Sequence, residues 1–396
     1  MRLCVVSSKE CWQDDTGTWM SSGGFPAQMA ALGALFDELT LVIVRGRPMT
    51  GGMPLPRHAQ VVPLRCPVGD DIRRKVSVAA NSIHYLTSIT RHVRSADVVH
   101  TPLPGDISFL GMTVATALRK RLFGMYNGSW ITNPQTTVMD KVTRAWMKIL
   151  AGGNNVMVAV GPAGMATTPA RHMEWLFVTT IAQGELTTVQ PVLGRLPHSP
   201  LQVGYVGRLS PEKGLTHLIE AMSTLRADAT LTSPMPQLTL MGDGSQRSEL
   251  LAQVRRLRCE DLVHFAGQLD REELVRQLLR TDVCVLPSLT EGFPKATLDA
   301  MACGVPVITT DVGFGREIVG LDGQRGWVVP PGDAPALKAA LRRVLTGPVD
   351  WPRLRARCRM YVEGLTLEDW GLRIAQICAR QWSLSIVDGK LQSVRQ

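Results

Sequence analysis

The stretch TDVCVLPSLTEGFPKATLDAMACGVPVI, residues 281–308, decides the fold of this chain. Its apolar residues 283–286 predict a buried strand, and Pro287 and Gly292 mark the turn that follows. An amphipathic run from about Lys295 predicts a helix, which Gly304 separates from a second apolar strand over 305–308. Strand, helix and strand in this order build a parallel sheet, and such sheets bind ligands outside the carboxyl ends of their strands.

Three charged residues fall at that position. Glu291 lies in the turn, Lys295 at the helix start, and Asp299 about one turn further on. The free amides of a helix N-terminus favour anions, and carboxylates a turn apart can bind different parts of one extended ligand. A helix cap with a first-turn acid would explain either carboxylate alone. Together with Lys295 they predict a ligand that carries both hydroxyls and phosphates.

Length and composition indicate a globular protein of two domains. The chain has 396 residues, and it contains no run of eighteen apolar residues that could span a membrane. Its first residues, MRLCVVSSKECWQDD, predict a strand rather than a signal peptide. The eight cysteines are scattered, with no Cys-x-x-Cys pair and no Cys/His cluster. We therefore expect a reduced, cytoplasmic protein without structural zinc.

The positive charge is concentrated in the first half of the chain. Residues 1–200 hold 19 Lys and Arg against 12 Asp and Glu, and the remainder holds 24 against 22. A basic face of this kind is a candidate for peripheral contact with anionic lipid, at the inner face of a membrane, or with an acidic acceptor. An ordinary solvated surface explains the same charges. Nucleic acid is not expected, because the basic residues are not interleaved with aromatics.

The order of predicted elements gives an α/β protein with two doubly wound parallel sheets that face one another across a cleft. Strands and helices alternate through residues 1–192 and again through 201–365. Two prolines and a glycine within residues 193–200 predict the linker between these domains. A long amphipathic helix within 366–396 comes late enough to cross back to the first domain.

A second motif with charged residues follows the strand predicted over 203–206. It reads GRLSPEKG from Gly207 to Gly214, so Arg208 and Lys213 lie in a strand-to-helix turn. A diphosphate requires a backbone that allows close approach, a forked guanidinium and a point-charge ammonium. If the leaving group is a nucleoside diphosphate, these cations stabilise the charge that grows on it. Surface ion pairs within a loop are the alternative.

Two further strand ends carry weaker signals. Gly242 and Gly244 follow the strand predicted over 238–241 and permit a tight turn close to a ligand, although a plain turn would look the same. Gly267 and Leu269 end the next strand, where backbone groups would be placed to contact a base.

Taken together, these motifs resemble the family-4 retaining glycosyltransferases of glycosyl transferases group 1. The similarity rests on Gly207-Arg-x4-Lys-Gly214, the Gly242 turn, His264-Phe-x-Gly267, and the segment from Pro287 to Val307, and it covers about residues 200–335. In the first half, Gly23-Gly24 and Asp97-Val-Val-His100 are similar to the family pattern. The family has the GT-B architecture of two Rossmann-like domains and works without a metal ion. The resemblance therefore implies that architecture and no cofactor beyond the donor substrate.

The resemblance also implies roles for single residues. Arg208 and Lys213 would hold the donor diphosphate, with Gly24 approaching it from the other domain. Glu291 would contact the hydroxyls of the donor sugar, and Asp299 those of the ribose. The remaining residues implied in donor binding are Gly23, Gly207, Gly242, Gly267, Leu269, Phe293, Pro294 and Lys295. His100 would be the catalytic candidate of the first domain, with a buried structural histidine as the alternative.

Three positions depart from the family pattern. Asp299 stands where the family usually has Glu, Pro102 stands where many relatives have a second His, and residues 181–185 replace the usual Pro-Asn-Gly-Val. The shorter Asp299 side chain requires either a closer helix or a weaker ribose contact. The change at Pro102 leaves the role of His100 open.

The predicted function is transfer of a hexose, with retention, from a nucleotide diphosphate sugar that is expected to be UDP-linked. The acceptor is a hydroxyl, for which a lipid-linked glycan in bacterial exopolysaccharide synthesis is one candidate, because Trp146 lies among basic residues. Retaining glycosidases use one of two paired carboxylates as the nucleophile, and the sequence shows no such pair. We therefore expect the acceptor hydroxyl to attack from the front face, the side from which the diphosphate leaves. A sugar-nucleotide 2-epimerase and a GT-B protein that binds nucleotide without catalysis are the alternatives.

Overall fold

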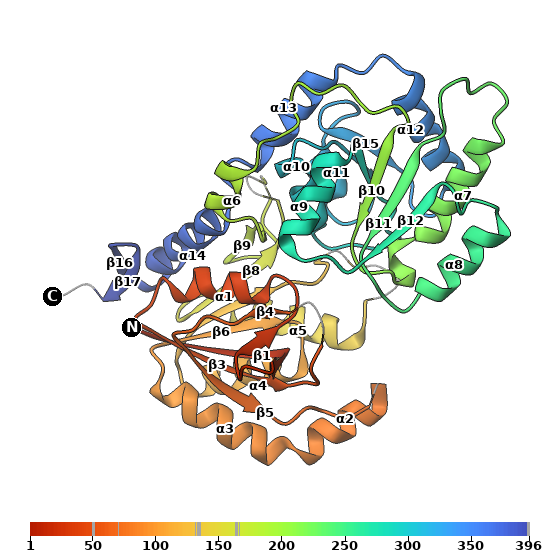
Figure 1. Cartoon of the computed structure of the whole chain (residues 1–396). Coiled ribbons are helices and arrows are strands. Elements are labelled where there is room, and N and C mark those ends of the chain that lie inside the picture. The colour runs from red at the N-terminus through yellow and green to blue at the C-terminus, as the bar shows by residue number, and fades with distance from the viewer. Residues whose placement is uncertain are drawn as a thin grey trace. The chain divides into compact units, whose positions relative to one another are not determined.

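The chain forms two compact units in a computed structural model that describes residues 1–49, 52–69, 71–130, 132, 136–162, 165 and 167–393 (Figure 1). Unit 1 comprises Met1–Thr180 and Leu367–Gln396, and unit 2 comprises Ile181–Thr366. Unit 2 is thus an insertion within the chain of unit 1. The last helix, α14 (Leu367–Trp382), belongs to the same unit as the N-terminal half, where it packs against α1 (Phe25–Gly33).

The segment expected to link the domains, residues 193–200, lies within unit 2, and the division falls earlier, at Ile181. The physical reason is that two of its side chains are fixed. Arg195 and His198 both bind the buried carboxylate of Asp282. A composition rich in proline and glycine therefore marks an irregular segment here, but not a free one.

Unit 1 is built on a parallel sheet with the strand order β5-β3-β1-β6-β7-β8-β9. These strands are β1 (Arg2–Gln13), β3 (Glu38–Arg45), β5 (Ala59–Leu64), β6 (Val98–Leu103), β7 (Arg121–Tyr126), β8 (Asn155–Val160) and β9 (Met173–Leu176). The short strands β2 (Trp19–Ser21) and β4 (Met53–Pro54) extend the long β1 in antiparallel fashion.

Helices cover both faces of this sheet (Figure 1). The helices α3 (Ser82–Ser95), α4 (Asp106–Ala117) and α5 (Val138–Leu150) share one buried cluster with the strands, so they lie on the same face. The helix α2 (Asp71–Ala80) precedes α3, and the hairpin β16 (Leu384–Val387) and β17 (Lys390–Ser393) follows α14.

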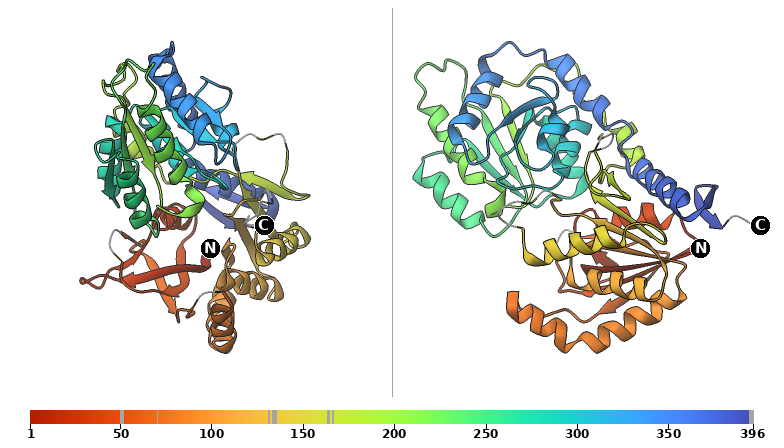
Figure 2. Two further views of the ribbon diagram at one scale, coloured as in Figure 1. Left: turned by 90° about the vertical axis from the view of Figure 1, so that its right-hand side faces the viewer. Right: turned by 180° about the vertical axis from the view of Figure 1, so that it is seen from behind.

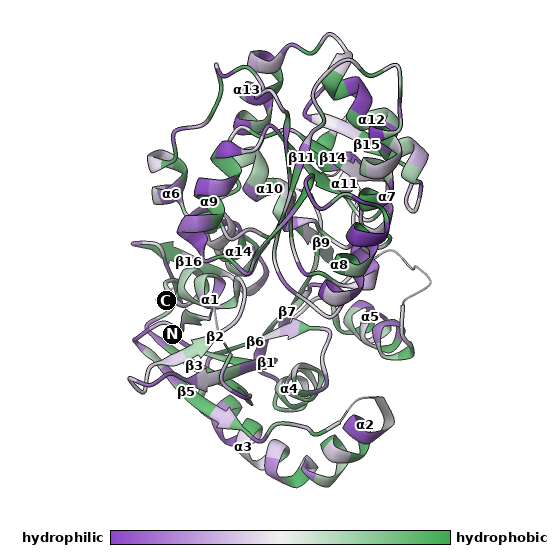
Figure 3. Ribbon diagram, turned by 45° about the vertical axis from the view of Figure 1, so that its right-hand side comes forward, coloured by the Kyte–Doolittle hydropathy of each residue, from purple (hydrophilic) through white to green (hydrophobic). Residues whose placement is uncertain are grey.

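Unit 2 has a parallel sheet with the order β12-β11-β10-β13-β14-β15, the doubly wound order predicted for it. The strands are β10 (Gln202–Val206), β11 (Gln237–Met241), β12 (Val263–Gly267), β13 (Val283–Leu286), β14 (Val307–Thr310) and β15 (Gly326–Val329). Every residue of β13 and β14 is buried, and β13 is apolar throughout; Figure 3 labels β14 and colours apolar residues green and hydrophilic residues purple. Strands covered on both faces need such continuous apolar runs.

Helices lie on both sides of the sheet of unit 2 (Figure 2). They are α6 (Gln183–Thr188), α7 (Leu215–Arg226), α8 (Arg247–Arg256), α9 (Arg271–Arg280), α10 (Lys295–Ala302), α11 (Gly315–Val319), α12 (Ala334–Thr346) and α13 (Trp351–Val362), with one 3-10 turn at Pro211–Lys213. The predicted strand, turn, helix and strand of residues 281–308 are therefore β13, α10 and β14.

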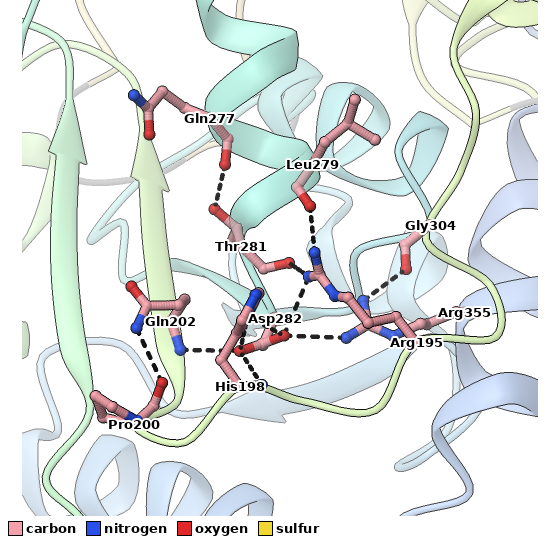
Figure 4. A network of polar contacts seen from close by, with 10 residues as sticks. All are labelled: Arg195, His198, Pro200, Gln202, Gln277, Leu279, Thr281, Asp282, Gly304 and Arg355. Atoms are coloured by element: carbon pink, nitrogen blue, oxygen red, sulfur yellow. Dashed lines mark hydrogen bonds and ion pairs between the residues drawn. The ribbon is translucent and has the colours of Figure 1, made fainter.

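A buried carboxylate fixes the amino ends of the two central strands (Figure 4). Asp282, which has no exposed surface, directly precedes β13, and its Oδ2 accepts hydrogen bonds from the amides of Gln202 and His198 at 3.0 and 2.9 Å. Its Oδ1 accepts from Arg195 at 3.1 Å and from the fully buried Arg355 of α13 at 3.2 Å. Burial lowers the pKa of Arg355, and Asp282 opposes that effect. The pair therefore compensates charges that the core would otherwise exclude.

We expect Asp282→Ala to destabilise unit 2 by about 3–5 kcal/mol, because Arg355 would keep its charge in the core without the carboxylate that neutralises it. Urea unfolding at pH 7, followed by circular dichroism, measures the change. The matched control is Asp311→Ala, since Asp311 pairs with Arg316 at the surface, with both side chains about half exposed; there we expect at most about 1 kcal/mol. Equal unfolding midpoints for the two variants would contradict the assignment.

Candidate functional site

The chain order reverses between β10 and β13, the two adjacent central strands of unit 2. In doubly wound sheets, ligands bind at such a point, in a crevice outside the carboxyl ends of the two strands and between the loops that follow them. The loop after β10 is 207–214, and the loop after β13 is 287–294. Both motifs that the sequence singled out therefore stand at the same place.

The two loops touch through a glycine. Gly214 has φ +63°, and a Cβ on it would lie 2.2 Å from the carbonyl oxygen of Pro287. The left-handed conformation and the close approach both exclude larger residues. The amide of Leu289 also donates to the carbonyl of Glu212 at 2.8 Å, so the loops are joined by backbone on both sides of Lys213.

Lys213 and Glu291 form an ion pair across the two loops. The Lys213 Nζ lies 2.5 Å from Oε2 of Glu291, and the hydroxyl of Ser288 donates to the same oxygen at 3.2 Å. The side chains are 18% and 17% exposed, so the pair is partly shielded from water but remains accessible. The residues predicted for the diphosphate and for the sugar hydroxyls thus lie in direct contact.

Arg208 stands at the open edge of the same loop. Its side chain is 76% exposed, and Nη2 donates to Oε1 of Glu212 at 3.1 Å. Burial alone would raise the pKa of Glu212, but a bond from Ser210 and the charges of Arg208 and Lys213 lower it. Both cations therefore act on the same carboxylate, and most of the guanidinium of Arg208 faces solvent.

Three glycines meet at the ends of β10, β11 and β12. The amide of Gly207 donates to the carbonyl of Met241 at 3.1 Å, and the amide of Gly242 donates to the carbonyl of Gly267 at 2.8 Å. A Cβ on Gly242 would lie 1.9 Å from the carbonyl oxygen of Gly207. All three glycines are partly exposed, although the side chain of Tyr205 lies against Gly207, and the partly buried Leu269 follows the row.

The start of α10 differs in part from what the sequence implied. Phe293 and Pro294 are buried, and the amide of Lys295 donates to the carbonyl of Phe293 at 3.0 Å, so that amide already has a partner within the turn. The side chain of Lys295 keeps exposed surface, yet surrounding protein displaces water and lowers its pKa, and Lys213 adds to this effect. Asp299 and Glu291 oppose the shift. Lys295 thus adds a third positive charge beside the Lys213–Glu291 pair.

Asp299 is held by an arginine that the sequence analysis did not single out. Arg271 of α9 donates to Oδ1 of Asp299 at 2.7 Å and binds Glu185 of α6 through two bonds of 2.8 and 2.5 Å. Burial would lower the pKa of Arg271, but the two carboxylates outweigh it and raise the pKa. Asp299 itself is only 9% exposed. No spacing in the sequence reveals this bridge, because its members come from three separate helices.

The candidate residues of unit 1 fall into two groups. His100 lies within β6 with no exposed surface, stacks on Phe123 at 4.7 Å, and binds the Phe123 carbonyl through Nδ1 at 2.9 Å. Burial lowers the pKa of His100 to about 4, so the ring is neutral at pH 7. This placement favours the structural alternative, since a catalytic role would require access to substrate. Gly23 and Gly24, by contrast, precede α1 at an accessible turn, and Gly23 has φ +67°.

Among the described residues, no group of three or more His, Cys, Asp or Glu side chains is placed to hold a metal ion. The polar groups of the site in unit 2 are instead the three cations Arg208, Lys213 and Lys295 with the carboxylates of Glu291 and Asp299. Such a set suits a phosphorylated ligand with hydroxyl groups.

Comparison with known proteins supports this interpretation. Residues 193–363 match the family model of glycosyl transferases group 1. The chain is 37% identical over 195 residues to a glycogen synthase of Mycobacterium tuberculosis (strain H37Rv), which covers 49% of this chain and 45% of that protein. The chain thus spans about half the length of the curated relatives it matches.

Solved structures resemble almost the whole chain. Sucrose-phosphate synthase from Thermosynechococcus elongatus has a TM-score of 0.72 at 22% identity and covers 97% of this chain and 99% of its own. Anabaena HepE in complex with UDP-glucose has a TM-score of 0.69 at 16% identity, with 96% and 100% covered. These likenesses establish the GT-B fold that the sequence predicted. Residues 193–363, which carry both loops of the site, thus match glycosyl transferases group 1, and the chain as a whole shares the GT-B fold.

Proposed function

We propose that the protein is a retaining glycosyltransferase. Its donor is a UDP-linked hexose, and it transfers the hexose to a hydroxyl group of a glycan or lipid-linked acceptor. The observation that carries this proposal is the contact between Lys213 and Glu291 at the point where the strand order of unit 2 reverses. It joins the cation proposed for the diphosphate to the carboxylate proposed for the sugar hydroxyls, as a donor whose diphosphate is bonded to its sugar would require.

The reaction then follows from the charges. The bond between the sugar C1 and the diphosphate oxygen breaks, and negative charge grows on the departing nucleoside diphosphate. Lys213 and the exposed Arg208 stabilise that charge. The acceptor oxygen forms its bond to C1 on the same face, and its proton passes to the departing phosphate oxygen. Glu291 orients the sugar by accepting hydrogen bonds from its hydroxyls, while it also keeps Lys213 in place before the donor binds.

The nucleotide is proposed from two lines of support. Asp299, the carboxylate proposed for the ribose hydroxyls, lies one turn into α10 and is bound by Arg271. HepE, which shares the fold, has been solved with UDP and with UDP-glucose. A glycogen synthase among the relatives supports a glycan as acceptor. Independence from metal ions and a cytoplasmic location remain part of the proposal.

We expect Lys213→Ala and Arg208→Ala each to lower kcat by about 10²–10³, because each removes a charge that stabilises the leaving group. The measurement is the release of UDP from UDP-glucose by hydrolysis, in which water takes the place of the acceptor. Arg276→Ala is the matched control: its guanidinium lies on α9, is 57% exposed, and pairs only with its own helix neighbours among the described residues. Near-normal rates in both site variants would overturn the mechanism. Conversion of the sugar without release of UDP would indicate the epimerase instead.

We expect UDP at a hundred times its Kd to raise the free energy of unfolding by about 2.7 kcal/mol, and GDP or ADP at the same concentration to raise it less. Thermal unfolding measures the shift.

Asp299→Asn should weaken the binding of UDP by roughly 10- to 100-fold, because a hydrogen bond to a charged group is lost. The same variant should leave the affinity for inorganic pyrophosphate unchanged. Equal losses for UDP and pyrophosphate would place Asp299 away from the ribose.

A further inference from the structure

The helix α5 of unit 1 presents an apolar face to solvent. Val138, Val142, Trp146 and Ile149 follow one another at intervals of four, four and three residues, so they lie along one side of the helix. Their exposed fractions are 76%, 39%, 47% and 74%. A surface helix normally turns its apolar side inward, and large apolar groups gathered on the outside mark a contact surface.

The helix is firmly held by its other side, so this exposure is a property of the folded unit. Met147 is buried in the core cluster beneath α3, α4 and α5. The buried Arg144 donates to the carbonyl of Trp130 at 2.7 Å. At the N-terminus, Thr137 and Asp140 form a reciprocal capping box. The inner face of α5 therefore supplies the packing, and the outer face is left for another partner.

The charges of α5 complement an anionic surface. Lys141 and Lys148 are exposed on the helix, and the ammonium of Lys148 lies 5.7 Å from the ring centre of Trp130. The only carboxylate of α5, that of Asp140, accepts hydrogen bonds from the amide and hydroxyl of Thr137 and from Tyr126. The negative charge is thus engaged in capping, and the positive charges flank the apolar stripe.

A second helix on the same face of the sheet has a similar outer side. On α3, Ile83 is 78% exposed and Leu86 40% exposed, and Arg91 and Arg94 follow one and two turns later beside a shallow hollow of about 490 Å³. Because α3 and α5 share one buried cluster, both present these groups on the side of unit 1 away from its sheet. Figure 3 shows α5 with green apolar segments alongside purple ones.

We propose that the outer face of α5 docks on a bilayer that contains anionic lipid, with Trp146 and Ile149 at the level of the headgroups and the lysines on the phosphates. Helices that lie in a membrane surface combine Trp and aliphatic residues on one face with lysine beside them. Interfaces between proteins, in contrast, are depleted of lysine. Every helix of the described residues is too short or too polar to cross a bilayer, so contact from the surface is the mode that α5 allows.

Docking itself requires no glycosyl transfer. Its link to a lipid-linked acceptor rests on the proposed function. Such an acceptor would reach the docked enzyme by diffusion within the plane of the membrane. Donor hydrolysis, in which the charge-stabilising residues proposed above, Arg208 and Lys213, belong to unit 2, keeps the two proposals separable.

The test is co-sedimentation of the full chain with vesicles of phosphatidylcholine containing phosphatidylglycerol, compared with vesicles of phosphatidylcholine alone, at low salt. We expect binding to the anionic vesicles only. Trp146→Ser combined with Ile149→Ser should weaken it at least tenfold. Lys141→Gln combined with Lys148→Gln should weaken it about thirtyfold, at roughly 1 kcal/mol for each lysine. The matched control, Leu321→Ser with Met360→Ser, changes two apolar side chains of unit 2 that are 80% and 59% exposed and should bind as the wild type does.

Circular dichroism and donor hydrolysis verify that the variants are folded and that unit 2 is intact. Unchanged vesicle binding in the Trp146/Ile149 variant, or no binding by the wild type, would overturn the proposal. Light scattering distinguishes the other occupant. If the wild type is a dimer that fails to bind vesicles and the Trp146/Ile149 variant is a monomer, the face pairs two copies of the chain and the lipid assignment is wrong.

Discussion

The geometry of the candidate site depends on one buried charge at the opposite edge of the sheet. Asp282 has no exposed surface, and three different segments supply its partners: the stretch before β10, the first residue of β10 and the helix α13. Each partner that moved away would leave a charge or a polar group unpaired in the core, which costs several kcal/mol. The amino ends of β10 and β13 are therefore fixed relative to each other (Figure 4).

Fixing one end of two adjacent parallel strands also sets the distance between the loops at their other end. At that end, two contacts join the loops: the backbone of Gly214 lies against Pro287, and Lys213 pairs with Glu291. The ion pair has a second consequence. A lysine and a carboxylate that neutralise each other can be held in a partly buried position at low cost, and both remain ready for a ligand with complementary groups.

Sequence patterns were sufficient where the structure depends on local order. The apolar run 283–286 and the amphipathic run from Lys295 are found as β13 and α10 at the predicted residues, because each period reflects a face that must be buried. The two strand-to-helix loops met as expected, since adjacent parallel strands end at one edge. The family resemblance singled out Lys213 and Glu291, which the structure brings into contact, while their roles stay predictions.

Tertiary placement was beyond such patterns. Arg271 binds Asp299 and Glu185 only because α9, α10 and α6 converge in space, and the contacts span 28 and 86 positions of sequence. The stretch 193–200 has the composition of a linker, but the partners of Arg195 and His198 lie more than eighty residues later. Whether His100 is buried likewise depends on both neighbouring strands, so the sequence left two roles open.

The division of the chain into two units also constrains the order in which those units can fold during synthesis. Unit 1 needs residues from both ends: Lys390 and the N-terminal amine both bind Asp37, and Trp382 donates to the carbonyl of Asn154. Unit 2 is contained in one continuous stretch, so on the ribosome it can reach its native state while the earlier-synthesised half still awaits its final helix and hairpin. A nascent chain can thus complete unit 2 before unit 1, whose sheet receives the packing of α14 only after residue 382 has been synthesised.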